Sequence, residues 1–146
     1  MGYWRSFYHL IWGTKLREPL IDEDRERLLQ QSIRASCEKQ KAIVHAVGIM
    51  PDHVHLAASV PPTIAITDFV RLVKGSSSHL LNQRSKRSRF ETFSWQAEFG
   101  MLTFGERSLK EVRDYIDNQR THHAEGTLLP SFEQLEPLIP RNGSHS

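Results

Sequence analysis

The sequence contains one cysteine, no long apolar run and little net charge, and each shortage excludes a class of protein. Cys37 is the single cysteine in 146 residues, so the chain cannot form an internal disulfide, and one thiol fits a reducing compartment. No run of about 18 apolar residues occurs, which excludes a transmembrane helix. The first residues also lack the pattern of a secretory signal. We therefore expect a cytoplasmic protein with no membrane partner.

The length and composition are those of one globular domain. Hydrophobic residues make up 38% of the chain and charged residues 25%. The net charge of +2 predicts no partner by itself, but the stretch from Phe69 to Phe90 contains no acidic residue. Its basic residues are Arg71, Lys74, Arg84, Lys86, Arg87 and Arg89. Such a stretch is either a solvated surface or a site for nucleic-acid phosphates, and we interpret these six residues as candidate DNA contacts.

Side chains that alternate between two faces predict the strands. The predicted strands are Tyr3–Thr14, Ala42–Met50 and His53–Val60, with one or two short strands within Phe93–Phe104. The dipeptide Pro51-Asp52 predicts a short turn, which would make the second and third strands an antiparallel hairpin.

Apolar periodicity and capping residues predict three helices. They run from an N-cap at Asp22 to about Gln40, from an N-cap at Thr67 to about Gln83, and from Ser108 past Gln119. In the last helix, Ser108 and Glu111 have the spacing of a capping box. We expect residues 1–125 to form one α+β domain, a two-layer ferredoxin-like antiparallel sheet with helices packed on it. A Pro-rich arm, partly disordered, would follow over 126–146.

Two pairs of polar side chains suggest a catalytic site. His53 and His55 are one residue apart in a predicted strand, so they project from the same face of the sheet. Tyr115 and Gln119 are four residues apart in a predicted helix and share a face of it. If that helix packs on that sheet face, possible metal ligands would meet a phenol. A metal beside a tyrosine suits attack on a phosphodiester.

Each feature also has a simpler interpretation. Most His-x-His pairs on strands bind nothing, and a tyrosine on a helix usually packs at the edge of a core. Asp52 is either an acceptor that orients a ligating histidine or a turn-forming residue. Three aromatic residues could stack on unpaired bases, although core packing is the more common role for any one of them. These residues are Trp12, Phe93 and Trp95.

Three segments resemble one known family. They are YHLIWGTK from Tyr8, MPDHVHL from Met50 and VRDYIDNQ from Val112. Together they are similar to the single-tyrosine HUH transposases, the insertion-sequence-200-like family that includes the REP-associated tyrosine transposases. The similarity extends from roughly Tyr3 to His123, so residues 1–125 would be the transposase domain.

The resemblance implies a metal-dependent single-strand DNA endonuclease and strand transferase that acts near DNA hairpins. His53, His55 and Gln119 would hold a divalent metal, Mg or Mn, and Tyr115 would be the nucleophile that forms a 5′-phosphotyrosine. The implied partners are single-stranded and hairpin DNA and a second copy of the chain in a homodimer.

Two other functions remain open. A nucleic-acid-binding α+β module without catalysis, such as a domesticated transposase, would explain the basic residues equally well. A histidine-dependent phosphoesterase would need a second His-x-Thr or His-x-Ser motif on a strand, and the sequence contains none.

Overall fold

A computed structural model of the protein describes residues 3–84 and 92–119. Its elements are β1 (Tyr8–Gly13), η1 (Lys15–Arg17), α1 (Glu23–Lys39), β2 (Ile43–Met50), β3 (His53–Ser59), α2 (Ile66–Arg84), β4 (Gly100–Thr103), η3 (Glu106–Ser108) and α3 (Leu109–Asp117). The expected arm over 126–146 lies outside the described residues. Within them, no helix is long and apolar enough to cross a membrane.

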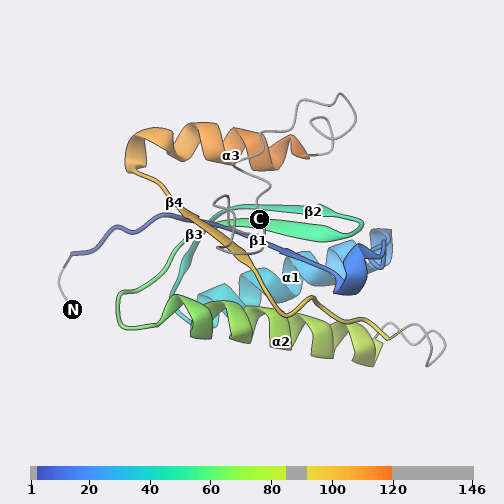
Figure 1. Ribbon diagram of the computed structural model, residues 1–146. Coiled ribbons are helices and arrows are strands. Elements are labelled where there is room, and N and C mark those ends of the chain that lie inside the picture. Colours follow the sequence, from blue (N-terminus) through green and yellow to red (C-terminus); the bar gives the residue numbers. More distant parts are fainter. Residues whose placement is uncertain (1–2, 85–91, 120–146) are drawn as a thin grey trace, which may run out of the picture.

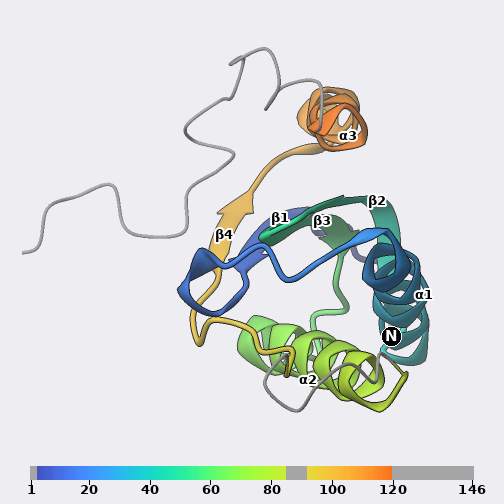
Figure 2. The same cartoon turned by 90° about the vertical axis from the view of Figure 1, so that its right-hand side faces the viewer.

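The four strands form one antiparallel sheet in the order β2-β3-β1-β4 (Figure 1). Helices α1 and α2 cover one face of this sheet, and α3 lies over the opposite face (Figure 2). The expected α+β fold with a ferredoxin-like strand order is therefore confirmed. The position of α3 matters for function, because it adds a helix to the sheet face that the first two helices leave open.

Strand alternation sorts the side chains of β3 into two clusters. Val54 and Leu56 join the main core, between the sheet and helices α1 and α2. Ala57 faces the other way and packs in a much smaller cluster with Val112 and Ile116 of α3. Each fully buried aliphatic side chain contributes roughly 1.5–3 kcal/mol to the free energy of folding. Since the cluster under α3 contains far fewer such side chains, apolar burial holds α3 to the sheet less strongly than it holds α1 and α2.

The hairpin of β2 and β3 and the N-cap of α1 follow the sequence-based expectation. The Asp22 side chain accepts a hydrogen bond from the Arg25 backbone N–H at 2.9 Å. β1, in contrast, begins at Tyr8 rather than Tyr3. Before it, the Ser6 hydroxyl bonds both the N–H and the carbonyl of Val60, which replaces strand pairing with side-chain contacts.

One predicted helix start and one predicted capping bond are wrong. α2 begins at Ile66, so Thr67 lies inside the helix, and the Ala65 carbonyl accepts the bond from the Phe69 N–H. At α3, Ser108 makes no side-chain capping bond. The reason is local: Ser108 already ends the 3-10 turn η3 and has helical dihedral angles, whereas a capping residue is normally extended.

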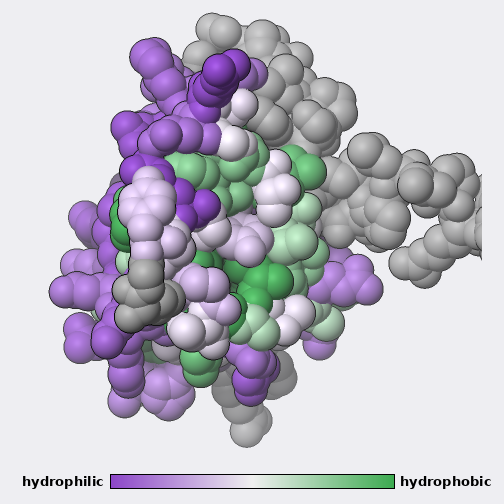
Figure 3. Space-filling view, turned by 90° about the vertical axis from the view of Figure 1, so that its left-hand side faces the viewer, coloured by the Kyte–Doolittle hydropathy of each residue, from purple (hydrophilic) through white to green (hydrophobic). Residues whose placement is uncertain are grey.

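The region Phe93–Phe104 forms one strand, β4, and a single bridge between Trp95 and Thr14. This bridge brings the segment before β4 next to the end of β1. Figure 3 shows the other end of the molecule, away from the turn between β2 and β3, where apolar residues gather in the middle of the face and hydrophilic residues lie along its margin.

Candidate active site

β3 places His53 and His55 side by side on the sheet face that α3 covers. Their side chains are 1% and 0% exposed, and their ring centroids are 5.2 Å apart. The intervening Val54 points into the main core. The alternation inferred from the sequence is therefore confirmed, and the two imidazoles project into the space beneath α3.

α3 brings Tyr115 to the same place. The Tyr115 ring lies 6.1 Å from the His55 ring, centroid to centroid, in an edge-on arrangement. Both Tyr115 and Gln119 are 3% exposed. α3 ends at Asp117, Asn118 follows as a turn residue, and Gln119 is again helical, whereas the sequence predicts one unbroken helix through Tyr115 and Gln119. The four predicted residues nevertheless converge within one chain.

A glycine on β2 permits this close approach. Gly48 pairs with His55 in the sheet. A Cβ atom at Gly48 would lie 2.8 Å from the Ile116 carbonyl oxygen and 3.5 Å from the Gln119 Cβ. The absence of a side chain therefore lets the last turn of α3 rest directly on the backbone beside His55.

Both imidazoles are held through Nδ1. The His53 Nδ1 lies 2.7 Å from Asp52 Oδ1, and the His55 Nδ1 lies 2.8 Å from the Nε2 of His9. With Nδ1 engaged in each ring, Nε2 is the nitrogen that each histidine can present to a metal.

Asp52 combines the two roles that the sequence left open. Its backbone carbonyl accepts from the Thr14 N–H at the turn, while its carboxylate contacts His53. Burial raises the pKa of Asp52, but hydrogen bonding and charge from His53 and Arg17 outweigh burial and lower that pKa below its usual value. The carboxylate therefore stays ionised beside the imidazole.

His9 and Arg17 were missed by the sequence reasoning. His9 shares a face of β1 with Ile11 and Gly13, which pair with His55 and His53, so strand parity could have identified it. Arg17 could not be found this way, because it reaches the site from the turn η1. Its Nη2 lies 3.3 Å from Asp52 Oδ2 and 3.4 Å from His53 Nδ1.

The donor set limits which metal could bind. Across residues 3–84 and 92–119, no group of three or more His, Cys, Asp or Glu side chains could hold a metal ion. A site here would consist of two imidazoles and the amide oxygen of Gln119. This mixed nitrogen and oxygen set fits a divalent ion such as Mn and leaves coordination positions for substrate oxygens.

The predicted DNA contacts are not equivalent in the structure. Arg71 is exposed and pairs with Asp68 at 3.0 Å, and Arg84 is exposed at the end of α2. Lys74 is half-buried, and its Nζ donates to the carbonyl of Gln96 at 2.6 Å and to the next two carbonyls. Burial lowers the pKa of the Lys74 ammonium. The remaining three residues, Lys86, Arg87 and Arg89, lie outside the described ranges.

The three aromatic candidates for base stacking also differ in their exposure to solvent. Trp12 is 0% exposed and Phe93 is 1% exposed, so both are core residues. Trp95 is half-buried and lines an open pocket with the residues of η1. Among the three, Trp95 is the ring that a base could reach.

The structure thus combines a ferredoxin-like sheet, a His-x-His pair on one strand and a tyrosine-bearing helix packed over that pair. A family model described as "Transposase IS200 like" matches residues 3–119, and the chain belongs to this family. The resemblance seen in the sequence is thereby confirmed.

Named relatives agree with this assignment. The chain is 30% identical over 115 residues to the ISDra2 transposase TnpA of Deinococcus radiodurans, covering 77% of this chain and 82% of that protein. It is 26% identical to the IS200 transposase of Salmonella typhimurium, covering 97% of this chain and 89% of that protein.

Two solved structures have the same fold. A putative transposase from Deinococcus radiodurans superposes with a TM-score of 0.64 at 29% identity, over 82% of this chain and 95% of that one. A REP-associated tyrosine transposase bound to a REP hairpin gives a TM-score of 0.62 at 14% identity, over 97% of this chain and 96% of that one.

Proposed function

We propose that this transposase is a metal-dependent single-strand DNA endonuclease and strand transferase that acts near DNA hairpins. The observation that carries the proposal is the convergence of Tyr115 with His53, His55 and Gln119 in one chain. The hairpin bound to the REP-associated relative supports hairpin DNA as the partner.

In the proposed reaction, the Tyr115 oxygen attacks the scissile phosphorus. The bond from phosphorus to the 3′ oxygen breaks, the leaving strand takes a proton to become a free 3′-OH, and the other strand end stays on the enzyme as a 5′-phosphotyrosine. Attack by another 3′-OH reverses the step and joins strands, so no ATP is required.

His53, His55 and Gln119 would hold a Mg or Mn ion. When bound, that ion would stabilise the negative charge that develops on the phosphoryl oxygens. Asp52 and His9 would fix the two imidazole rings through Nδ1, which keeps Nε2 of each ring directed to the metal.

The DNA backbone would be contacted by basic residues outside the catalytic centre. The proposed contacts are Arg71, Lys74, Arg84, Lys86, Arg87 and Arg89. We also propose that the chain acts as a homodimer, as many members of the family do.

Covalent adduct formation tests the nucleophile. A labelled DNA hairpin with a single-stranded flank, incubated with the protein and Mn²⁺, should yield an adduct that survives denaturing electrophoresis. Tyr115→Phe should abolish the adduct and preserve hairpin binding, because only the attacking oxygen is removed. His53→Ala should lose both cleavage and Mn²⁺ dependence. An adduct formed by Tyr115→Phe would contradict the assignment.

One observation favours a second candidate, a DNA-binding module without catalysis. Tyr115 is 3% exposed, so a phosphate can reach it only if residues around it shift, and α3 is one element that could do so. Because only a small apolar cluster lies beneath α3, a shift of α3 should require less free energy than a shift of α1 or α2. Hairpin binding without any adduct, in Mn²⁺ or Mg²⁺, would favour the non-catalytic module.

A further inference from the structure

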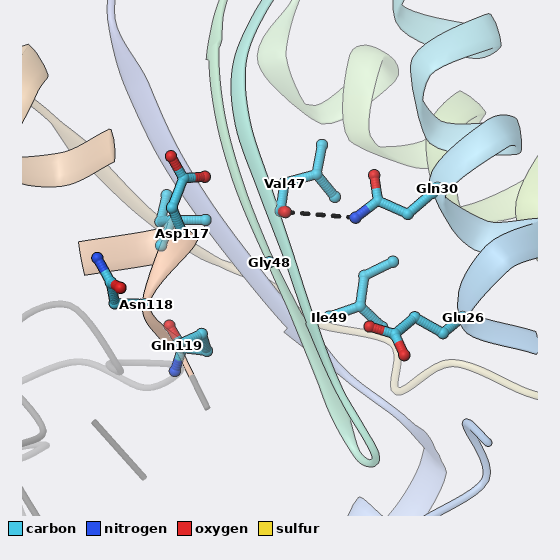
Figure 4. A pocket seen from close by; sticks show the side chains of 9 residues that line it. Glu26, Gln30, Val47, Gly48, Ile49, Asp117, Asn118 and Gln119 are labelled. Atoms are coloured by element: carbon cyan, nitrogen blue, oxygen red, sulfur yellow. Dashed lines mark hydrogen bonds between the residues drawn. The ribbon is translucent and has the colours of Figure 1, made fainter. Parts of the chain in front are cut away.

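Two pockets flank the candidate site, and their lining residues carry opposite charges. One, of about 260 Å³, follows the edge strand β2, with Glu26 and Gln30 of α1 on one side and Asp117, Asn118 and Gln119 on the other (Figure 4). The other, of about 400 Å³, lies between η1 and the segment before β4. Its lining residues are Lys15, Leu16, Arg17, Ser94, Trp95, Gln96 and Ala97.

The charges indicate which pocket a nucleic acid would enter. The lining beside β2 includes two carboxylates, Glu26 and Asp117, which would repel phosphates. The lining at η1 includes two cations, Lys15 and Arg17, and no acidic residue. The η1 pocket is also within the size range of small-molecule sites, roughly 300–1,000 Å³.

The wall formed by η1 is locally strained. Leu16 and Arg17 have φ angles of 57° and 54°, a left-handed conformation that is unfavourable for residues other than glycine. The Thr14 hydroxyl holds the turn by donating to the Glu18 carbonyl at 2.6 Å. The turn leaves the Leu16 side chain 78% exposed. An apolar side chain held in solvent by a strained turn gains nothing from the core, which suggests that a ligand covers it.

The opposite wall is fixed by α2. The Trp95 indole donates to the Ser77 hydroxyl at 3.0 Å and to the Lys74 carbonyl at 3.1 Å. Its ring also packs edge-on against Phe93 and Trp12. The Lys74 ammonium holds the next residues through their carbonyls. Contacts within the chain therefore hold both walls, and walls fixed in this way lower the entropy cost of binding.

We propose that this pocket binds one unpaired nucleotide of the DNA strand that is cut. The base packs against Leu16 and Trp95, and the adjoining phosphate is neutralised by Lys15 and Arg17. Because Arg17 also contacts Asp52 and His53, the bound nucleotide lies next to the scissile position. The inference rests on the proposed function, since it assigns part of the same substrate.

The test measures binding in the presence of EDTA, so it depends on neither metal nor Tyr115. Fluorescence anisotropy compares a blunt hairpin with the same hairpin carrying a single-stranded flank. Leu16→Gly removes the apolar contact while relieving backbone strain, so the variant should fold at least as well as the wild type. Leu72→Ala, which alters a leucine 51% exposed on α2, is the matched control.

We expect Leu16→Gly to weaken binding of the flanked hairpin about tenfold, because the base loses the apolar surface of one aliphatic side chain, and to leave binding of the blunt hairpin unchanged. The control Leu72→Ala should bind both DNAs as the wild type does. One abasic position in the flank should cause the same loss in the wild type and no further loss in Leu16→Gly. Equal losses on both DNAs, or wild-type binding by Leu16→Gly, would overturn the inference.

A second variant keeps the test decisive if Leu16→Gly does not fold. Lys15→Gln should reduce the salt dependence of flanked-hairpin binding by about one phosphate contact, with no change for the blunt hairpin. An unchanged salt dependence would overturn the phosphate assignment. If the wild type binds neither DNA, the proposed function itself fails. If binding behaves as expected but no adduct forms, only the catalytic proposal fails.

Discussion

The substitution Gly48→Ala tests how tightly α3 packs over the catalytic residues. The new Cβ would lie 2.8 Å from the Ile116 carbonyl oxygen and 2.9 Å from the Ile116 Cγ2, and the first of these atoms is backbone that cannot rotate away. To reach an ordinary contact distance of about 3.4 Å, the last turn of α3 must move by roughly half an ångström. Tyr115 precedes Ile116 directly, so it moves as well.

The magnitude follows from overpacking and from the geometry of attack. Overpacking in a well-packed region costs about 1–3 kcal/mol, which should appear as a lower free energy of unfolding. A displacement of about 1 Å can cost 10²-fold in rate, so half of that should slow adduct formation about tenfold. Adduct formation is followed by denaturing electrophoresis, and unfolding by circular dichroism in urea.

Gly75→Ala is the matched control. Apart from its chain neighbours and the nearby backbone of α2 itself, no atom of the described residues lies within 4 Å of the position that its Cβ would occupy. Replacing a mid-helix glycine by alanine should therefore stabilise the protein by about 0.5–1 kcal/mol and leave adduct formation unchanged. If Gly48→Ala is as stable and as active as the wild type, α3 does not rest on Gly48 in the working enzyme, and the packing argument fails.

Two further predictions concern a buried histidine and the buried thiol. His9→Phe should weaken Mn²⁺ binding about 10–100-fold in calorimetry, because His55 loses the hydrogen-bond partner of its Nδ1. His9→Gln should recover part of that loss. An unchanged Mn²⁺ affinity in His9→Phe would refute the orienting role of His9. Burial raises the pKa of the Cys37 thiol from 9.0 to about 12, so its contribution to stability is complete below pH 9 and is lost above it. Urea unfolding should detect a loss of about 1 kcal/mol at pH 10 that Cys37→Ala lacks, and identical pH profiles would contradict this.

The features that could be predicted from the sequence are those that depend only on residues close together in the chain. Alternation assigned His53 and His55 to one face of β3, because strand side chains alternate whatever lies above them. The Asp22 cap could be predicted for the same reason, since donor and acceptor are three residues apart. The Ser108 capping box failed because a 3-10 turn already occupies the residues that would have to be extended.

The parts of the site that could not be predicted depend on distant residues. The bond between His9 and His55 joins positions 46 apart, and no short window of sequence contains both. Gly48 has no positive φ to explain it; its role becomes clear only when Ile116 is found above it. The sequence identified the side chains proposed to be catalytic, but residues that contact them come from neighbouring strands.

The basic residues show that DNA contacts are predicted less well by the charges along the sequence than by the charges that the fold brings together in space. Lys74 belongs to the acid-free stretch, yet its ammonium is occupied by three backbone carbonyls and fixes the wall that carries Trp95. Lys15 and Arg17 lie outside that stretch, but the bridge between Thr14 and Trp95 places them across a pocket from an aromatic ring. A phosphate responds to all charges within about 10 Å at physiological salt. Lys15 and Arg17 should therefore add to the attraction of DNA although they lie outside the acid-free stretch, and the Asp52 carboxylate, 3.3 Å from Arg17, offsets part of the Arg17 charge.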